Sequence, residues 1–309
     1  MKKFCLKLSI ILLLFIVLNI LYKNTRFYRS ENEMNVFENI PYELELANLG
    51  SSHGLYGIKY DSVPEINAHN FALKMQPYFY DYAILKKYVN HFSKEAVILI
   101  PVSYFNVLGH FDYSNFRKRY YRILGKKEMD FWSFKEDLIY SKFPILIAGT
   151  DLLHIVNDIS KEESSPYYER TSYLESDTLH KFCKDRYDAL TAEEFNKGEE
   201  GYKRNLISVS KIIDFCYLNN LIPVIITTPI NEYLNSLYEE DGIFIPSYER
   251  FTSDLCKKYP DLLYLDYSHD IRFSTHNELF ADGDHLNNNG AELFTKIIIE
   301  DLRKKELLK

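Results

Sequence analysis

The chain has 309 residues, of which 46% are hydrophobic and 26% charged. It is therefore long enough for one large domain or two small ones, and too apolar for a disordered protein. Its 37 basic and 44 acidic side chains give a net charge of −7, and no stretch of the chain concentrates basic residues. Nucleic-acid binding is thereby disfavoured, because phosphate contacts need a concentrated basic face.

The N-terminus is a basic start followed by a hydrophobic segment from Phe4 to Tyr22, interrupted by Lys7. Its length is close to the roughly 20 residues that a helix needs to cross a bilayer. A cleaved signal peptide is the alternative, but no small-x-small cleavage site follows, so we favour an uncleaved membrane anchor. Basic residues flank both sides of the segment and leave the orientation open. The default for such an anchor places the large domain outside the cytoplasm.

Strands and helices alternate along the rest of the chain. We expect residues 1–28 to be the anchor and tether, with polar tether sequence over 23–39, and residues 29–309 to be one domain. Its middle, about 106–198, is a Tyr-rich insert of helical segments and loops. The other predicted elements are strands at 42–48, 65–72, 96–102, 222–227 and 262–266, and helices at 76–92, 199–220, 248–259 and 290–307.

Two of these strands fix the expected class of fold. Ala96–Val102 and Ile222–Thr227 are continuous apolar runs, which are typical of a parallel sheet covered on both faces. Helices between the strands then predict a three-layer α/β/α sandwich with a mostly parallel sheet. In such sheets, binding and catalytic sites form at the C-terminal ends of the strands.

A Gly-Ser-Ser-His-Gly sequence, residues 50–54, directly follows the first predicted strand. A serine at a tight, glycine-flanked turn between a strand and a helix presents its hydroxyl beside backbone N–H groups, which suits a nucleophile. The same sequence is also an ordinary turn. A phosphate-binding loop is disfavoured, because the loop lacks a Walker lysine and the GxGxxG spacing.

Before the last predicted helix, Asp282 precedes His285 by three residues. A carboxylate beside an imidazole fixes its tautomer and stabilises the imidazolium that forms when histidine takes a proton from serine. A calcium loop does not fit the spacing of this acidic segment. Its polar continuation, Asn287–Asn289, also suits a helix N-cap. The cysteines, spaced without a CxxC pair, predict neither a disulfide framework nor a zinc site.

A serine after the first strand and an Asp-x-x-His before the last helix resemble the SGNH/GDSL hydrolase superfamily. The similarity is greatest to its membrane-anchored envelope branch, which includes the lipoteichoic-acid D-alanylation and alginate-type O-acetylation proteins. It covers the body from about Tyr42 to the C-terminus and rests on the two end motifs. The resemblance implies a flavodoxin-like sheet and a serine esterase or acyltransferase.

The resemblance also implies individual roles. Ser52 would be the nucleophile, His285 the general base and Asp282 the acid that orients it. The Gly-x-Asn-Asp sequence of the family's oxyanion hole is missing, and Asn70, Asn106 and Gln76 are the candidate donors in its place. We expect His53 to be an accessory neighbour. Asp284 could compete with Asp282, but its position next to His285 makes contact with the ring harder.

Together these features predict an extracytoplasmic, membrane-tethered enzyme that forms an acyl-serine intermediate without a metal or organic cofactor. Its expected substrate is a cell-envelope glycan or acylated polymer, and hydrolysis and acyl transfer both remain open. A membrane-bound acyltransferase is a further candidate partner. The alternative is a catalytically inactive SGNH-like accessory protein that binds glycan or such an acyltransferase, because the oxyanion sequences are irregular.

Overall fold

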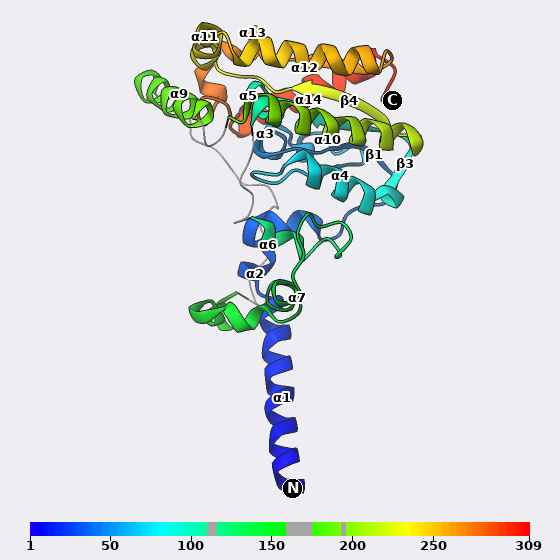
Figure 1. Cartoon of the computed structure of the whole chain (residues 1–309), viewed down its shortest axis with the longest axis vertical. Helices are drawn as coiled ribbons and strands as arrows, with labels where there is room; N and C mark the ends of the chain where they lie inside the picture. Colours follow the sequence, from blue (N-terminus) through cyan, green and yellow to red (C-terminus); the bar gives the residue numbers. More distant parts are fainter. Residues whose placement is uncertain (110–115, 159–174, 193–195) are drawn as a thin grey trace. The chain divides into compact units, whose positions relative to one another are not determined.

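The computed structural model describes residues 1–109, 116–158, 175–192 and 196–309 (Figure 1). The chain forms two compact units. The first combines residues 1–38 with the described residues from 116 to 158, and the second combines 39–109, 175–192 and 196–309. The second unit contains all the strands that the structure describes and all the candidate site residues.

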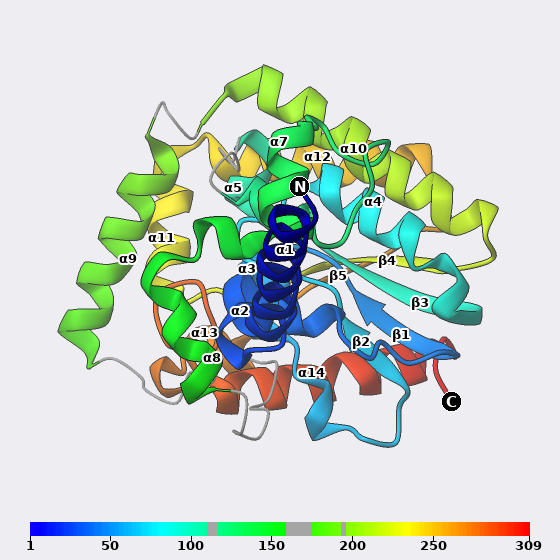
Figure 2. The same cartoon turned by 90° about the horizontal axis from the view of Figure 1, so that it is seen from below.

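The second unit is built on a five-stranded parallel sheet with the strand order β2-β1-β3-β4-β5 (Figure 2). This arrangement confirms the predicted α/β class with its parallel sheet. The central strand β3 lies between β1 and β4, and its register pairs Leu99 with Asn48 on one side and Val224 on the other. The strands are β1 (Leu44–Asn48), β2 (Ala68–Asn70), β3 (Phe92–Pro101), β4 (Ile222–Thr227) and β5 (Leu263–Asp266).

Helices cover both faces of this sheet. The long helix α14 lies on one face, and α4, α10 and α12 lie on the other (Figure 2). The helices of this unit are α3 (Ser52–Gly57), α4 (Tyr78–Lys87), α5 (Tyr104–Leu108), α9 (Ser176–Thr191), α10 (Gly198–Leu218), α11 (Glu232–Asp241), α12 (Phe244–Lys258), α13 (Ile271–Ser274) and α14 (Asn288–Lys304), with short 3₁₀ turns η2 (Tyr60–Ser62), η3 (Val89–His91) and η7 (Asn277–Leu279).

The predicted elements match the structure in type and order, and most of their ends differ by at most three residues. The larger differences are at the start of β3, the start of α12 and the end of α4. The second strand is only three residues long, and the helix expected over 76–92 ends at Lys87. The helix ends early because β3 already begins at Phe92. The first residues of β3 precede its apolar run and are partly buried or exposed. Apolar content marks the buried part of a strand and misses an exposed end.

The face of the sheet under α14 holds a continuous apolar core. Val97 and Leu99 of β3 point to this face, because side chains alternate along a strand, and both are fully buried. Phe294 of α14 packs in the same cluster, with its ring 5.1 Å from that of Tyr267 and 5.6 Å from that of Phe273. The core thus fixes α14 on the sheet, and with it the loop that precedes the helix.

Replacing Phe294 with alanine is expected to lower the free energy of unfolding by about 3–5 kcal/mol, because the large cavity cannot be refilled by rigid aromatic neighbours. The neighbouring Leu293, on the same helix but 37% exposed, is the matched control. Its alanine variant should change stability by less than about 1 kcal/mol. Urea denaturation of both variants measures the difference. Equal effects would contradict the packing described for α14.

The regular elements in the described part of the first unit are all helices or helical turns. Its elements are α1 (Lys2–Lys23), α2 (Arg26–Ser30), η1 (Glu31–Phe37), α6 (Arg117–Tyr120), α7 (Phe134–Asp137), the π-helical turn η4 (Leu138–Lys142), η5 (Pro144–Ile147), η6 (Gly149–Leu153) and α8 (His154–Asn157). Helix α1 is long and apolar enough to cross a membrane. The segment expected to be a tether is instead folded, since Tyr28 packs with Tyr22 and Ala148 in a small apolar cluster.

Candidate active site

The turn after β1 requires both of its glycines. Gly50 has a φ of +111°, a conformation that side chains disfavour. A Cβ on Gly54 would lie 2.4 Å from the carbonyl oxygen of Leu49, so no larger residue fits there. The chain therefore reverses within a few residues, and Ser52 becomes the first residue of α3. Its backbone N–H consequently has no acceptor within the helix.

A buried carboxyl group, that of Asp81, is hydrogen-bonded to the backbone of this turn. Asp81 of α4 is 1% exposed, and its Oδ1 accepts hydrogen bonds from the N–H of Gly50 at 2.8 Å and from Nε2 of Gln76 at 2.7 Å. Burial raises the pKa of Asp81 to about 7. Asp81 was not among the predicted site residues, although a single acid on the apolar face of a predicted helix is a signal that could have indicated it.

Ser52, His285 and Asp282 form a continuous hydrogen-bonded chain. The Oγ of Ser52 lies 2.8 Å from Nε2 of His285, and Nδ1 of the same ring lies 2.9 and 3.0 Å from the two carboxylate oxygens of Asp282. In the neutral ring, with Nδ1 carrying its proton toward Asp282, Nε2 is left as the acceptor of the serine proton. Asp282 is itself held by the backbone N–H of His285, at 2.9 Å. The structure thus brings together the three residues predicted as nucleophile, base and orienting acid.

A second carboxylate also reaches the imidazole. The Oδ1 of Asp284 lies 3.2 Å from Nδ1 of His285, so the expectation that its neighbouring position hinders such a contact is wrong. Asp284 is 1% exposed, and its Oδ2 forms an ion pair with Nε of Arg186 at 2.8 Å. The same oxygen lies 3.2 Å from Nε2 of His53. Arg186 comes from α9 in the insert, and no sequence signal indicated it.

These charges shift the pKa values of His285 and His53 in opposite directions. Burial alone would lower the pKa of His285, but the carboxylates of Asp284 and Asp282 raise it to about 9. For His53, burial outweighs the contact with Asp284 and lowers the pKa. The pKa of Asp284 would rise on burial, yet the charges of Arg186 and His285 hold it well below its ordinary value. At neutral pH the resting site therefore contains a charged His285 and a neutral His53, whose rings stack with centroids 4.8 Å apart.

Asn70, the first oxyanion candidate, is used inside the fold. Its Nδ2 donates to the carbonyl oxygens of Gly54 at 2.9 Å and Ile58 at 3.0 Å. Its Oδ1 accepts from Nδ2 of Asn48 and from the N–H of Ala72. The fully buried side chain thus ties the end of β2 to α3, with both amide hydrogens committed. It stabilises the turn and has no hydrogen left to donate to an oxyanion.

The other two candidates lie beside one cavity of the second unit. Gln76 donates to Asp81 and to the carbonyl oxygen of Phe71 at 3.1 Å, so its amide also serves the fold. Asn106 belongs to α5, just beyond β3, and is 7% exposed. Both line a cavity of about 490 Å³ that also reaches Ser51, next to the candidate nucleophile. Three basic residues of α10 line it farther along: Lys203, Arg204 and Lys211.

The described residues also contain one cluster with the composition of a metal site. Ligand atoms of His53, Asp284 and His285 lie within 4.8 Å of one another. However, the guanidinium of Arg186 already supplies a positive charge at Asp284. His285 is in addition engaged on both ring nitrogens, by Ser52 and Asp282. The donor set therefore fits an acid–base arrangement better than a cation site.

Comparisons with known proteins leave the family open. No family model matches the chain, and no curated protein matches it either. Among solved structures, the chain is similar to a candidate acylhydrolase from Bacteroides fragilis, with 10% sequence identity and a TM-score of 0.40. The match covers 91% of this chain and 96% of the other. Similarity at this level establishes neither a family nor an activity.

Proposed function

We propose that this protein is a serine-dependent esterase or O-acyltransferase of the SGNH type, with Ser52, His285 and Asp282 as its catalytic residues. The observation that carries the proposal is the continuous contact from Ser52 Oγ to His285 at 2.8 Å and from His285 to Asp282 at 2.9 Å. A serine, a histidine and an acid in this order of contact form the arrangement that activates a serine hydroxyl in acyl transfer.

In the proposed reaction, Ser52 Oγ attacks the carbonyl carbon of an ester while its proton moves to Nε2 of His285. Asp282 stabilises the imidazolium that results. The backbone N–H of Ser52 and the side chain of Asn106 are the donors we assign to the tetrahedral oxyanion. The carbon–oxygen bond to the leaving alcohol then breaks, and His285 returns the proton to that alcohol. Water or a sugar hydroxyl next attacks the acyl-serine, with His285 again accepting a proton. The bond between the acyl carbon and Ser52 Oγ then breaks, and His285 returns the proton to Oγ.

The proposed substrate is an acylated glycan or polymer of the cell envelope, handled outside the cytoplasm. Two features support this class of substrate. The cavity beside Ser51 is large enough for more than an acyl group, since ligand sites commonly measure about 300–1,000 Å³. The apolar helix α1 would hold the enzyme at a membrane surface if it is retained. A membrane-bound acyltransferase is a candidate source of the acyl group.

A second candidate function is an inactive accessory protein of the same fold. The specific observation in its favour is that the side-chain amides of Asn70 and Gln76 donate their hydrogen bonds to groups within the fold. The remaining oxyanion donors are then fewer than three. Such a protein would bind glycan or an acyltransferase and would tolerate loss of the serine hydroxyl.

Labelling with a serine-reactive fluorophosphonate distinguishes the two functions. The full chain is the right sample, because residues 1–38 fold together with 116–158. We expect a stoichiometric adduct on Ser52, located by intact mass and peptide mapping, that is lost in Ser52→Ala and His285→Ala. Ser62→Ala, whose partly buried hydroxyl donates to the carbonyl oxygen of Lys59, is the matched control and should label fully. A folded wild-type protein that forms no adduct would favour the accessory function.

A further inference from the structure

Helix α1 is bound to the insert by side chains that lie within its apolar stretch. Asn19 donates to the carbonyl oxygen of Lys142 at 3.0 Å and accepts from the N–H of Ile145 at 3.4 Å. One turn earlier, the ring of Phe15 lies 5.6 Å from that of Phe143. These contacts place η4 and η5 against the C-terminal half of α1, at the level of residues that would lie inside a bilayer.

The same insert exposes large apolar side chains that nothing in the described part of the first unit covers. Val156 is 83% exposed, Phe134 68% and Leu153 67%. A small helical subdomain in water would bury such residues or replace them with polar ones. We call this set the apolar rim; its members are Phe131, Phe134, Leu146, Ile147, Leu153 and Val156.

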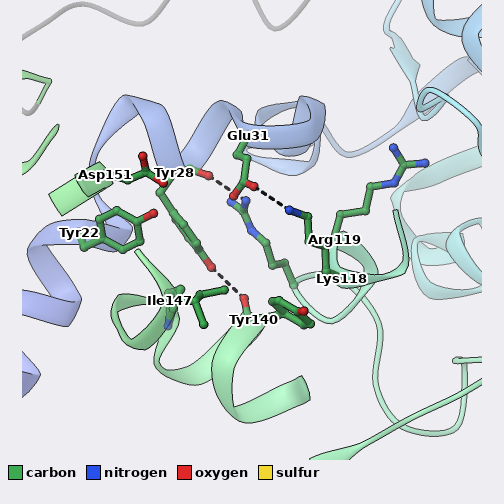
Figure 3. A pocket seen from close by; sticks show the side chains of 10 residues that line it. Tyr22, Tyr28, Glu31, Lys118, Arg119, Tyr140, Ile147 and Asp151 are labelled. Carbon is green, nitrogen blue, oxygen red and sulfur yellow. Dashed lines mark hydrogen bonds and ion pairs between the residues drawn. The ribbon is translucent and has the colours of Figure 1, made fainter. Parts of the chain in front are cut away.

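Tyrosines and basic residues gather where the apolar part of α1 ends. They line a pocket of about 150 Å³ that includes Tyr22, Tyr28 and Tyr140 (Figure 3). The hydroxyl of Tyr28 donates to the carbonyl oxygen of Tyr140 at 3.2 Å, and a guanidinium nitrogen of Arg122 donates to the carbonyl oxygen of Tyr28 at 2.8 Å. Tyrosine rings with neighbouring cations are the composition of a membrane–water interface.

We propose that the lipid bilayer covers the apolar rim, so that residues 131–156 lie in the membrane interface beside the C-terminal half of α1. The occupant follows from continuity with α1. Leu14, Ile16 and Leu18 are about half exposed on the part of α1 that carries Phe15, and the ring of Phe15 lies against that of Phe143. The insert that bears the rim therefore packs directly on the exposed apolar stretch of α1. Elements of this kind bury their apolar face about 5–10 Å into the boundary between headgroups and acyl chains. The inference rests on a membrane-inserted α1 and does not depend on the chemistry of Ser52.

The chain carries a single tryptophan, Trp132, within this segment, which makes depth measurable by fluorescence. The full-length Trp132→Phe variant, combined with Leu153→Trp, would be placed in lipid nanodiscs of phosphatidylcholine with and without bromine on the acyl chains. We expect the tryptophan at position 153 to lose most of its emission in the brominated lipid. Bromines near the headgroup end of the acyl chain should quench more strongly than bromines near its tip.

Leu218→Trp in the same Trp132→Phe background is the matched control, because Leu218 is as exposed as Val156 but lies outside the rim, at the end of α10. Its emission should be little affected by brominated lipid. Emission from position 153 that is equal in both lipids would overturn the proposal, and a blue-shifted, unquenched signal would identify a protein surface as the occupant. Equal quenching at positions 153 and 218 would also overturn it, since lipid contact would then not be specific to the rim.

Discussion

Replacing Asp282 with asparagine is expected to slow fluorophosphonate labelling of Ser52 about 10⁴-fold at every pH, the scale on which a wrongly oriented histidine reduces serine catalysis. Asparagine can still accept the N–H of His285, so the loop should keep its shape. Its amide group, however, favours the imidazole tautomer in which Nε2 carries the proton and cannot accept one from Ser52. The second-order rate constant of labelling gives this decrease in rate directly. It is measured from the intact mass of samples quenched at successive times.

Asp284→Asn is the matched variant, because Asp284 also approaches Nδ1 of His285 but is engaged with Arg186. We expect this change to lower the pKa of His285 and to retain most of the limiting labelling rate at high pH. Its main cost is stability, about 3 kcal/mol, since the guanidinium of Arg186 loses its buried partner. If both variants lost the same rate at all pH values, Asp282 would not be the orienting acid.

The labelling rate of the wild-type protein is expected to rise about tenfold for each pH unit below the pKa of its base, and to level off above it. Because Asp284 and Asp282 raise the pKa of His285 to about 9, the imidazole is protonated at neutral pH and cannot accept the proton of Ser52. Between pH 7 and pH 9 the increase should be about 50-fold, and the plateau above pH 9 about 100-fold over the rate at pH 7. A plateau already reached near the ordinary histidine pKa would show that the two carboxylates do not act together on the ring.

Stability should change in the opposite direction over the same range of pH. A pKa that is raised in the folded state contributes stability that is complete below the unfolded value, about 6.5, and disappears as the pH passes the folded value. For His285 the folded value is about 9. The wild type should therefore exceed His285→Gln by up to about 3 kcal/mol at pH 6, and this difference should shrink toward pH 9. Melting temperatures of both proteins over this range measure it, and a constant difference would contradict the raised pKa.

Much of the fold could be predicted because two of its strands, β3 and β4, contain continuous apolar runs. Ile222–Thr227 has the same bounds in sequence and structure, and the central strand was found from its buried residues. The three-residue β2 is too short to give a period of its own, so its predicted length was too great. The part of the insert over 116–158 was not predictable in detail, because its helices are short and its contacts are with α1, far away in the sequence.

Part of the site was predictable because the C-terminal ends of parallel strands meet at one edge of the sheet, where such sites form. Ser52 and His285 follow from that rule, and the structure brings them within hydrogen-bonding distance. The direction of a side chain does not follow from it, which is why Asn70 was chosen as a donor although it points into the fold. Arg186 could not be found either, because its partner Asp284 is 98 residues away and the pairing depends on where α9 packs.

The first unit is assembled from two stretches of chain with the sheet strands β1 to β3 encoded between them. Asn19 and Lys142 are 123 residues apart in the sequence. Because a ribosome adds about 5–20 residues per second, Lys142 is synthesised about 6–25 s after Asn19. During that interval α1 is present without its contacts to Lys142 and Ile145. The hydrogen bonds of Asn19 are thus late events in biogenesis, and their formation reports that the intervening segment has already been made.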